Sequence, residues 1–182
     1  MNDIYKLKLT VLQQEILRYL FVNSGKPSNA RRIAAALEVS QTGVSKALSG
    51  MQKRGLVLME KDRESGRWNI VQNIESAKVV GIKRAENLRM IYESGLAEFL
   101  ENELPGAAIM LFGSYSRGED VAESDIDMAV IGRKEKSVDL SGFEKFFRKE
   151  INLQFYPSFS SIHKSLKENI LGGILIAGGV EL

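Results

Sequence analysis

Two apolar runs, residues 107–112 and residues 126–131, limit what the C-terminal part of this chain can fold into. The first run is uninterrupted, and the second holds a single charged residue. Runs of this length and type are expected for strands that a sheet buries on both faces. A third, more mixed run covers residues 151–156, and helical patterns occupy residues 140–149 and 158–169. The C-terminal part is therefore predicted to form a mixed α/β domain.

The N-terminal part has the pattern of three short helices followed by a hairpin. Apolar residues at helical spacing predict helices over residues 10–23 and 41–54, with a shorter helix carrying residues 33–37 between them. Two strand patterns, residues 56–59 and 68–71, are joined by a polar turn. Three helices and a hairpin in this order describe a winged helix, so the whole chain is predicted to be an α+β protein.

The predicted organisation has three parts. Residues 1–74 form the winged helix, residues 75–104 form a helical linker with an expected break at Gly95, and residues 105–182 form the mixed α/β domain. Charge divides in the same way: the first part carries 12 Lys and Arg against 6 Asp and Glu, whereas residues 75–182 carry 13 against 17. This asymmetry favours a polyanion partner for the first part and cation binding for the rest.

Several classes of protein and site are excluded by residue usage. The chain has no Cys and a single His, His163, which excludes disulfides, thiolate nucleophiles, Cys-based zinc sites and His-rich metal clusters. No run approaches the roughly 18 consecutive apolar residues of a membrane-spanning helix. Residues 1–6 lack the apolar stretch of a signal peptide. We therefore expect a cytoplasmic protein with no membrane partner.

Residues 10–73 resemble the winged helix-turn-helix domains of prokaryotic transcriptional regulators, most clearly over residues 31–48. The outward positions of the third predicted helix carry Gln, Thr, Ser and Lys, which suit base edges and phosphates, and the hairpin adds arginines. The predicted DNA-binding residues are Gln41, Thr42, Ser45, Lys46, Arg63 and Arg67. We expect binding to duplex DNA, as a homodimer. The alternative is a winged helix that only docks another protein.

The segment between the first two apolar runs carries the residues suited to chemistry. Gly113 and Ser114 follow the first run, and a glycine there lets backbone N–H groups approach a phosphate closely. Arg117 adds positive charge. Asp125 and Asp127 share one face of the second run because strand side chains alternate. Two carboxylates so close repel each other unless a cation lies between them, and hard oxygen ligands favour Mg²⁺ or Mn²⁺. Such a pair suits phosphoryl transfer from a nucleotide.

The Gly113-Ser114 pair followed by Asp125-Ile126-Asp127 resembles the signature of the polymerase-β-like nucleotidyltransferase superfamily, particularly its minimal prokaryotic members. The likeness extends from about residue 91 to the C-terminus. It implies transfer of a nucleoside monophosphate from a nucleoside triphosphate to a hydroxyl acceptor. It also implies that Gly113, Ser114 and Arg117 hold the triphosphate, and that Asp125 and Asp127 are the catalytic residues that bind the metal.

A third carboxylate of that superfamily has no clear equivalent in this chain. Active members place it on a later strand, where Asn152 stands here, and Glu150 is a possible substitute at the start of that strand. An amide oxygen can ligate a cation but supplies no charge and takes no proton. Two alternatives to a transferase therefore stay open. One is an inactive, nucleotide-sensing transcriptional regulator, and the other is an autoregulating antitoxin with a toxin partner, as in minimal nucleotidyltransferases of that kind.

Overall fold

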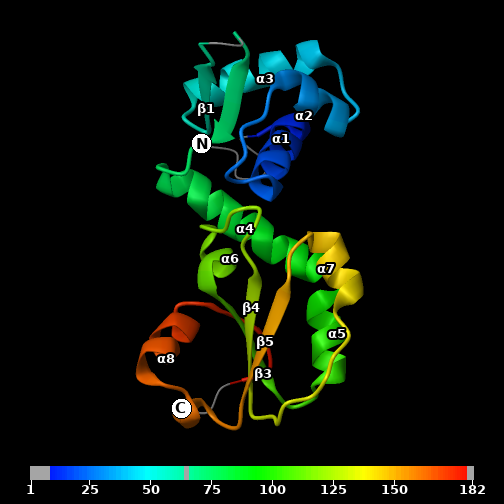
Figure 1. Ribbon diagram of the computed structural model, residues 1–182, viewed down its shortest axis with the longest axis vertical. Coiled ribbons are helices and arrows are strands. Elements are labelled where there is room, and N and C mark those ends of the chain that lie inside the picture. Colours follow the sequence, from blue (N-terminus) through cyan, green and yellow to red (C-terminus); the bar gives the residue numbers. More distant parts are fainter. Residues whose placement is uncertain (1–8, 64–65, 180–182) are drawn as a thin grey trace, which may run out of the picture. The chain divides into compact units, whose positions relative to one another are not determined.

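The computed structural model describes residues 9–63 and 66–179. The chain divides into two compact units, Met1–Val79 and Val80–Leu182, each with its own fold (Figure 1). Residues 1–6, where no signal peptide was expected, lie outside the described residues. So do residues 64–65 of the expected hairpin turn. None of the described helices combines the length and the hydrophobicity needed to cross a membrane.

The first unit is a winged helix, as predicted. Its elements are α1 (Val11–Val22), α2 (Ala30–Ala36), α3 (Gln41–Lys53) and the antiparallel strands β1 (Val57–Lys61) and β2 (Trp68–Gln72). Each helix starts at a residue whose side chain accepts a hydrogen bond from the first turn: Thr10, Asn29 and Ser40. Such caps satisfy backbone N–H groups that have no partner inside the helix. The short polar side chains between the apolar patterns therefore set the helix starts.

The core of the first unit is made by the apolar faces of these elements. Full burial of an aliphatic side chain contributes about 1.5–3 kcal/mol, so this small core holds the helices and hairpin together. A hydrogen bond from Gln72 to Ser24 satisfies two buried polar side chains beside it. The buried apolar residues include Ile16, Leu17, Leu20, Phe21, Ile33, Val44, Leu48, Met51 and Ile70.

The second unit contains a mixed sheet of four strands in the order β5-β4-β3-β6. Strand β4 pairs antiparallel with β3 and parallel with β5, and β6 pairs antiparallel with β3. The elements are α4 (Ala77–Glu93), which begins just before the boundary, α5 (Leu96–Glu103), β3 (Ala108–Phe112), α6 (Gly113–Arg117), β4 (Ile126–Ile131), α7 (Ser141–Phe147), β5 (Ile151–Tyr156), a 3-10 turn η1 (Phe159–Ser161), α8 (Lys164–Leu171) and β6 (Ile174–Ala177).

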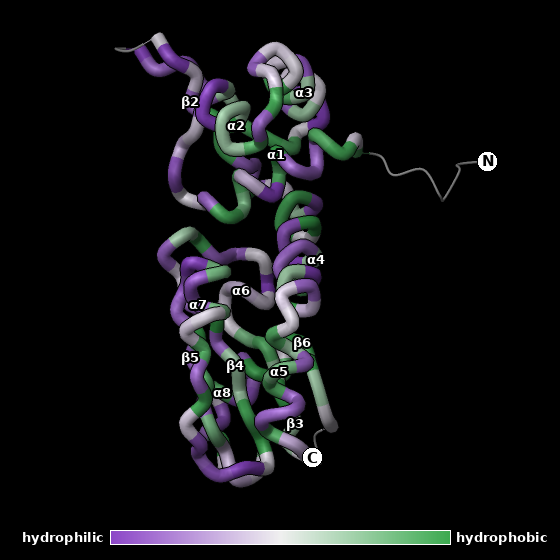
Figure 2. The backbone as a smooth tube through the Cα atoms, turned by 90° about the vertical axis from the view of Figure 1, so that its right-hand side faces the viewer, coloured by the Kyte–Doolittle hydropathy of each residue, from purple (hydrophilic) through white to green (hydrophobic). Residues whose placement is uncertain are grey.

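Both faces of the central strands are buried, as the apolar runs predicted. Helix α8 lies on one side of the sheet, and α5 and α7 lie on the other (Figure 1). Ile126, Met128 and Val130 pack in the cluster that contains α5, whereas Ala129 and Ile131 pack in the cluster that contains Ile170 of α8. Apolar segments recur along the strands (Figure 2). Strand β4 therefore directs its odd-numbered residues towards the α8 side.

The segment expected to be a linker supplies part of this core. Leu96, Leu100 and Leu104 are at most 1% exposed and belong to the same cluster as the strands. Gly95, at a φ of 79°, separates α4 from α5 as expected. The apolar face of α5 covers the sheet, so this helix is structurally part of the second unit.

Strand β6 was not predicted from the sequence. Its residues, Ile174–Ala177, form only a short apolar run between two pairs of glycines. One glycine of each pair is needed because the chain passes close to β3: a Cβ would lie 2.3 Å from the Leu111 carbonyl oxygen at Gly173 and 2.2 Å from the Ala107 carbonyl oxygen at Gly178. The four apolar residues are a weak local indication of a strand, and β3, with which they pair, is distant in the sequence.

Candidate functional site

The two aspartates lie at the start of β4, on the side of the sheet covered by α8. Ile126, between them, is fully buried on the opposite face. Asp127 is aligned with Phe112 of β3 and with Asn152 of β5. Both carboxylates are partly exposed. The alternation of β4 therefore brings Asp125 and Asp127 to one face at the edge of a buried strand, as the sequence predicted.

Gly113 lies against the Asp127 carboxylate. A Cβ on Gly113 would be 2.6 Å from Asp127 Oδ2, and the glycine has a φ of 73°. Both facts favour glycine, because L-residues avoid this left-handed region and an added Cβ would displace the Asp127 carboxylate. Helix α6 begins at Gly113, and the Ser116 hydroxyl donates to the Gly113 carbonyl oxygen at 2.8 Å. The glycine turn and the aspartate pair are thus one structural unit.

Asn152 completes this group of side chains. Its Nδ2 donates a hydrogen bond to Asp125 Oδ2 at 3.2 Å. Glu150, which directly precedes β5, is exposed, and its backbone carbonyl accepts a hydrogen bond from the Ile126 N–H at 2.9 Å. Register and hydrogen bonding therefore bring Asn152, and not Glu150, into contact with the aspartate pair.

The donor set fits a hard divalent cation. Two carboxylates and an amide oxygen are ligand types that Mg²⁺ and Mn²⁺ prefer. Within residues 9–63 and 66–179, the Asp127 side chain has no hydrogen bond or ion pair, and it is partly exposed. In the same residues, no group of three or more His, Cys, Asp or Glu side chains is positioned to hold a metal. Any ion here would therefore rely on two charged ligands and on oxygens from substrate or water.

A buried polar network supports the loop that precedes Asp125. Asp120 is 2% exposed and pairs with Lys83 Nζ at 3.1 Å and with Lys149 Nζ at 3.5 Å. Asn87 Nδ2 donates to Asp120 Oδ1 at 2.7 Å and to the Tyr115 carbonyl oxygen at 2.9 Å. Burial lowers the pKa of both ammonium groups, and the attraction of Asp120 opposes this shift.

Sequence reasoning missed this network. Lys149 follows Lys145 and Arg148 in a basic stretch that is typical of a solvated helix face. Only the fold turns the Lys149 side chain inward, where 6% of it is exposed. Lys83 and Asn87 are separated from Asp120 by more than thirty positions, and no local pattern links such distant residues.

Arg117 and Ser114 flank the glycine turn. Arg117 donates to Glu119 Oε2 at 2.8 Å and to Asn169 Oδ1 of α8 at 3.0 Å, and its side chain is 42% exposed. These contacts hold the guanidinium on the surface of α6. The partly exposed Ser114 accepts a hydrogen bond from the Glu119 N–H at its backbone carbonyl. A phosphate role for both residues stays a prediction.

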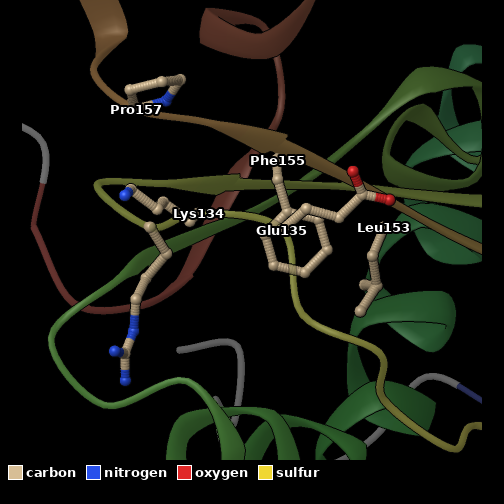
Figure 3. A pocket seen from close by; sticks show the side chains of 6 residues that line it. Lys134, Glu135, Leu153, Phe155 and Pro157 are labelled. Carbon is tan, nitrogen blue, oxygen red and sulfur yellow. The ribbon is translucent and has the colours of Figure 1, made fainter.

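A surface pocket lies beside β5 and the segment that follows β4. It has a volume of about 360 Å³ and is lined by Arg133, Lys134, Glu135, Leu153, Phe155 and Pro157 (Figure 3). Leu153 and Phe155 pack towards the α5 side of the sheet, the face opposite the aspartates. This pocket is therefore separate from the aspartate site.

The predicted DNA-binding residues all lie on the surface of the first unit. Gln41, Thr42, Ser45 and Lys46 lie along α3 with at least part of each side chain accessible, while Val44 and Leu48 of the same helix are fully buried. Arg63 and Arg67 are exposed in the hairpin. Trp68, the single tryptophan, begins β2 and is 49% exposed. Helix α3 thus presents a polar face of the residue types that were expected to contact DNA.

Comparison with solved structures finds partial matches. A mutant of ZitR from Lactococcus lactis is 24% identical, with a TM-score of 0.40, and the match covers 56% of this chain and 66% of that one. MepR, a transcription regulator of the Staphylococcus aureus multidrug efflux pump MepA, is 26% identical over 53% of this chain and 71% of its own, with a TM-score of 0.40. The chain spans slightly less than two thirds of the ZitR mutant.

A toxin-antitoxin structure with AMP-PNP is similar at 24% identity and a TM-score of 0.36, over 48% of this chain and 73% of that one. No curated protein sequence matches the chain. The family model described as "Nucleotidyltransferase domain" matches residues 93–174. That range contains β3, the glycine turn, both aspartates and β5. Residues 93–174 of this chain are therefore a nucleotidyltransferase domain, which follows a winged-helix unit.

Proposed function

We propose that this protein binds duplex DNA through α3 and the hairpin, and binds a nucleoside triphosphate with Mg²⁺ or Mn²⁺ at Asp125 and Asp127. The observation that carries the nucleotide proposal is the contact between Gly113 and the Asp127 carboxylate. It joins a glycine turn suited to phosphate to a pair of carboxylates suited to a cation. The polar surface face of α3 supports the DNA proposal.

In this proposal, each side chain has a separate task. Asp125 and Asp127 hold the metal, which when bound offsets the charge of the phosphate oxygens. Gly113 lets the backbone approach the triphosphate, and Ser114 contributes a hydroxyl. Arg117 exchanges its bond with Asn169 for a phosphate oxygen, because a charge-assisted bond to phosphate is stronger than one to a neutral amide.

Asn152 makes nucleotide binding without transfer the best-supported outcome. The amide bonded to Asp125 stands where a third carboxylate would act, and an amide can neither add charge nor accept a proton. The protein would then be a DNA-binding regulator that senses a nucleotide in the cell.

Transfer of the nucleotidyl group to a hydroxyl acceptor is the second candidate. The observation that favours it is the aspartate pair, because two carboxylates close together on one side of a sheet suit metal-assisted phosphoryl transfer.

The test is binding and turnover of labelled ATP, CTP, GTP and UTP with Mg²⁺, comparing the wild type with the Asp125→Asn, Asp127→Asn double variant. Saturable binding that the double variant loses, without label on DNA, RNA or protein, supports the sensor. Label on an acceptor with the wild type alone establishes the transferase. Equal binding by the two proteins would refute the aspartate site.

A further inference from the structure

Lys149 contacts the loop that leads into the aspartate pair. It lies just before β5, and its Nζ donates to the backbone carbonyl oxygens of Val121, of Ala122 at 3.3 Å and of Ser124 at 2.9 Å. Ser124 is directly followed by Asp125. The Val121 N–H in turn donates to Ser124 Oγ at 3.0 Å, which closes the loop on itself. One ammonium group therefore binds three carbonyls within a segment of four residues.

Lys83 provides an internal comparison. Its side chain is about as buried as that of Lys149, at 4% exposure against 6%, and its ammonium pairs with the same Asp120 carboxylate. Its backbone contact is the Asp120 carbonyl oxygen, and no contact of Lys83 with the carbonyls of residues 121–124 occurs in the described part of the chain. Both lysines thus pair with Asp120, and Lys149 differs from Lys83 because it also bonds to the carbonyls of residues 121, 122 and 124.

We propose that Lys149 is a positioning residue for the metal site, which it serves by holding residues 121–124 so that Asp125 enters β4 in the orientation needed for cation binding. This inference rests on the proposed function of Asp125 and Asp127. The three donors of an ammonium group match three carbonyl acceptors that converge on it. Asn152, on β5, holds the Asp125 carboxylate by a hydrogen bond. Lys149 holds the backbone of the residues that precede Asp125.

Electrostatics adds to this geometry. Asp120, Glu123 and Asp125 all attract the Lys149 ammonium. Two lysine side chains share the single Asp120 carboxylate, and the loop carbonyls add further acceptors for the Lys149 ammonium. A second layer of partners that orients metal ligands typically changes metal affinity by about 10–100-fold. We expect an effect of that size here.

The test compares full-length Lys149→Met, Lys149→Gln and Lys83→Met with the wild type. Affinity for Mn²⁺ alone and for Mn²⁺ with ATP is measured by calorimetry, and hydrogen exchange of residues 118–126 is measured by mass spectrometry without ligand. Thermal melting checks that each variant is folded. Lys149→Met should lose about 10–100-fold in Mn²⁺ affinity and exchange faster in this loop. Lys83→Met should be destabilised while keeping both properties near wild type.

Lys149→Gln retains N–H donors for the loop carbonyls and should recover part of the Mn²⁺ affinity. If Lys149→Met does not fold, the comparison of Lys149→Gln with the wild type tests the role of Lys149. Wild-type affinity and loop protection in folded Lys149 variants would overturn the proposal. So would equal losses in Lys83→Met, because they would assign the effect to the Asp120 ion pair. A wild type that binds no Mn²⁺ refutes the proposed function instead, and the exchange data still decide the role of Lys149.

Discussion

Replacement of Gly113 by alanine should separate the cost of backbone strain from the cost of displacing Asp127. Gly113 has a φ of 73°, and its added methyl group would meet Asp127 Oδ2 at 2.6 Å. Gly106 is a matched control, because its φ is 80° and no atom lies within 4 Å of an added Cβ. An L-residue in the left-handed region costs roughly 1–2 kcal/mol. Gly106→Ala should lose about that amount of unfolding free energy and nothing else.

Gly113→Ala should lose the same amount of unfolding free energy to backbone strain, and it should also bind the metal more weakly. The obstructing atom is the end of a side chain, so Asp127 can rotate away, and overpacking of this kind typically adds about 1–3 kcal/mol. The displaced carboxylate can no longer share a cation with Asp125, and we expect at least a tenfold loss of Mn²⁺ affinity, about 1.4 kcal/mol. Urea unfolding followed by circular dichroism and calorimetry with Mn²⁺ measure the two effects. Equal Mn²⁺ affinity in the two alanine variants would refute the reasoning.

Three further predictions follow from the positions of named residues. Asn152→Asp adds a carboxylate beside the aspartate pair and should raise Mn²⁺ affinity in calorimetry; unchanged or weaker binding would count against the shared site. Lys46→Ala with Arg67→Ala should weaken DNA binding and reduce its salt dependence, as followed by tryptophan fluorescence, while nucleotide affinity stays unchanged. Equal loss of both affinities would contradict separate binding units. Gly173→Ala should destabilise the second unit by about 1–3 kcal/mol or more because its Cβ meets backbone, whereas Gly172→Ala, with contacts of 3.5 Å, should melt near the wild-type temperature.

The elements with a strong periodic pattern were predictable from the sequence. The third predicted helix begins at Gln41 after the Ser40 cap, as the structure shows, and β4 and β5 match their apolar runs residue for residue. Hydrophobic periodicity and helix caps are local signals, so a single sequence contains them in full. Strand β6 was missed because its four residues are too few to indicate a strand by themselves, and it is identified as a strand by its pairing with β3.

The candidate site divides in the same way. The sequence by itself determined that Asp125 and Asp127 share a face and that Gly113 follows a buried strand, because alternation and strand burial depend on neighbouring residues. Only the tertiary structure decided that Gly113 contacts Asp127, that Asn152 bonds to Asp125, and that Lys149 turns inward to the loop. These contacts depend on strand register and on a helical crossover between β4 and β5. Alternation along a strand specifies register where one face is buried, but strands buried on both faces are continuous apolar runs that lack this alternation.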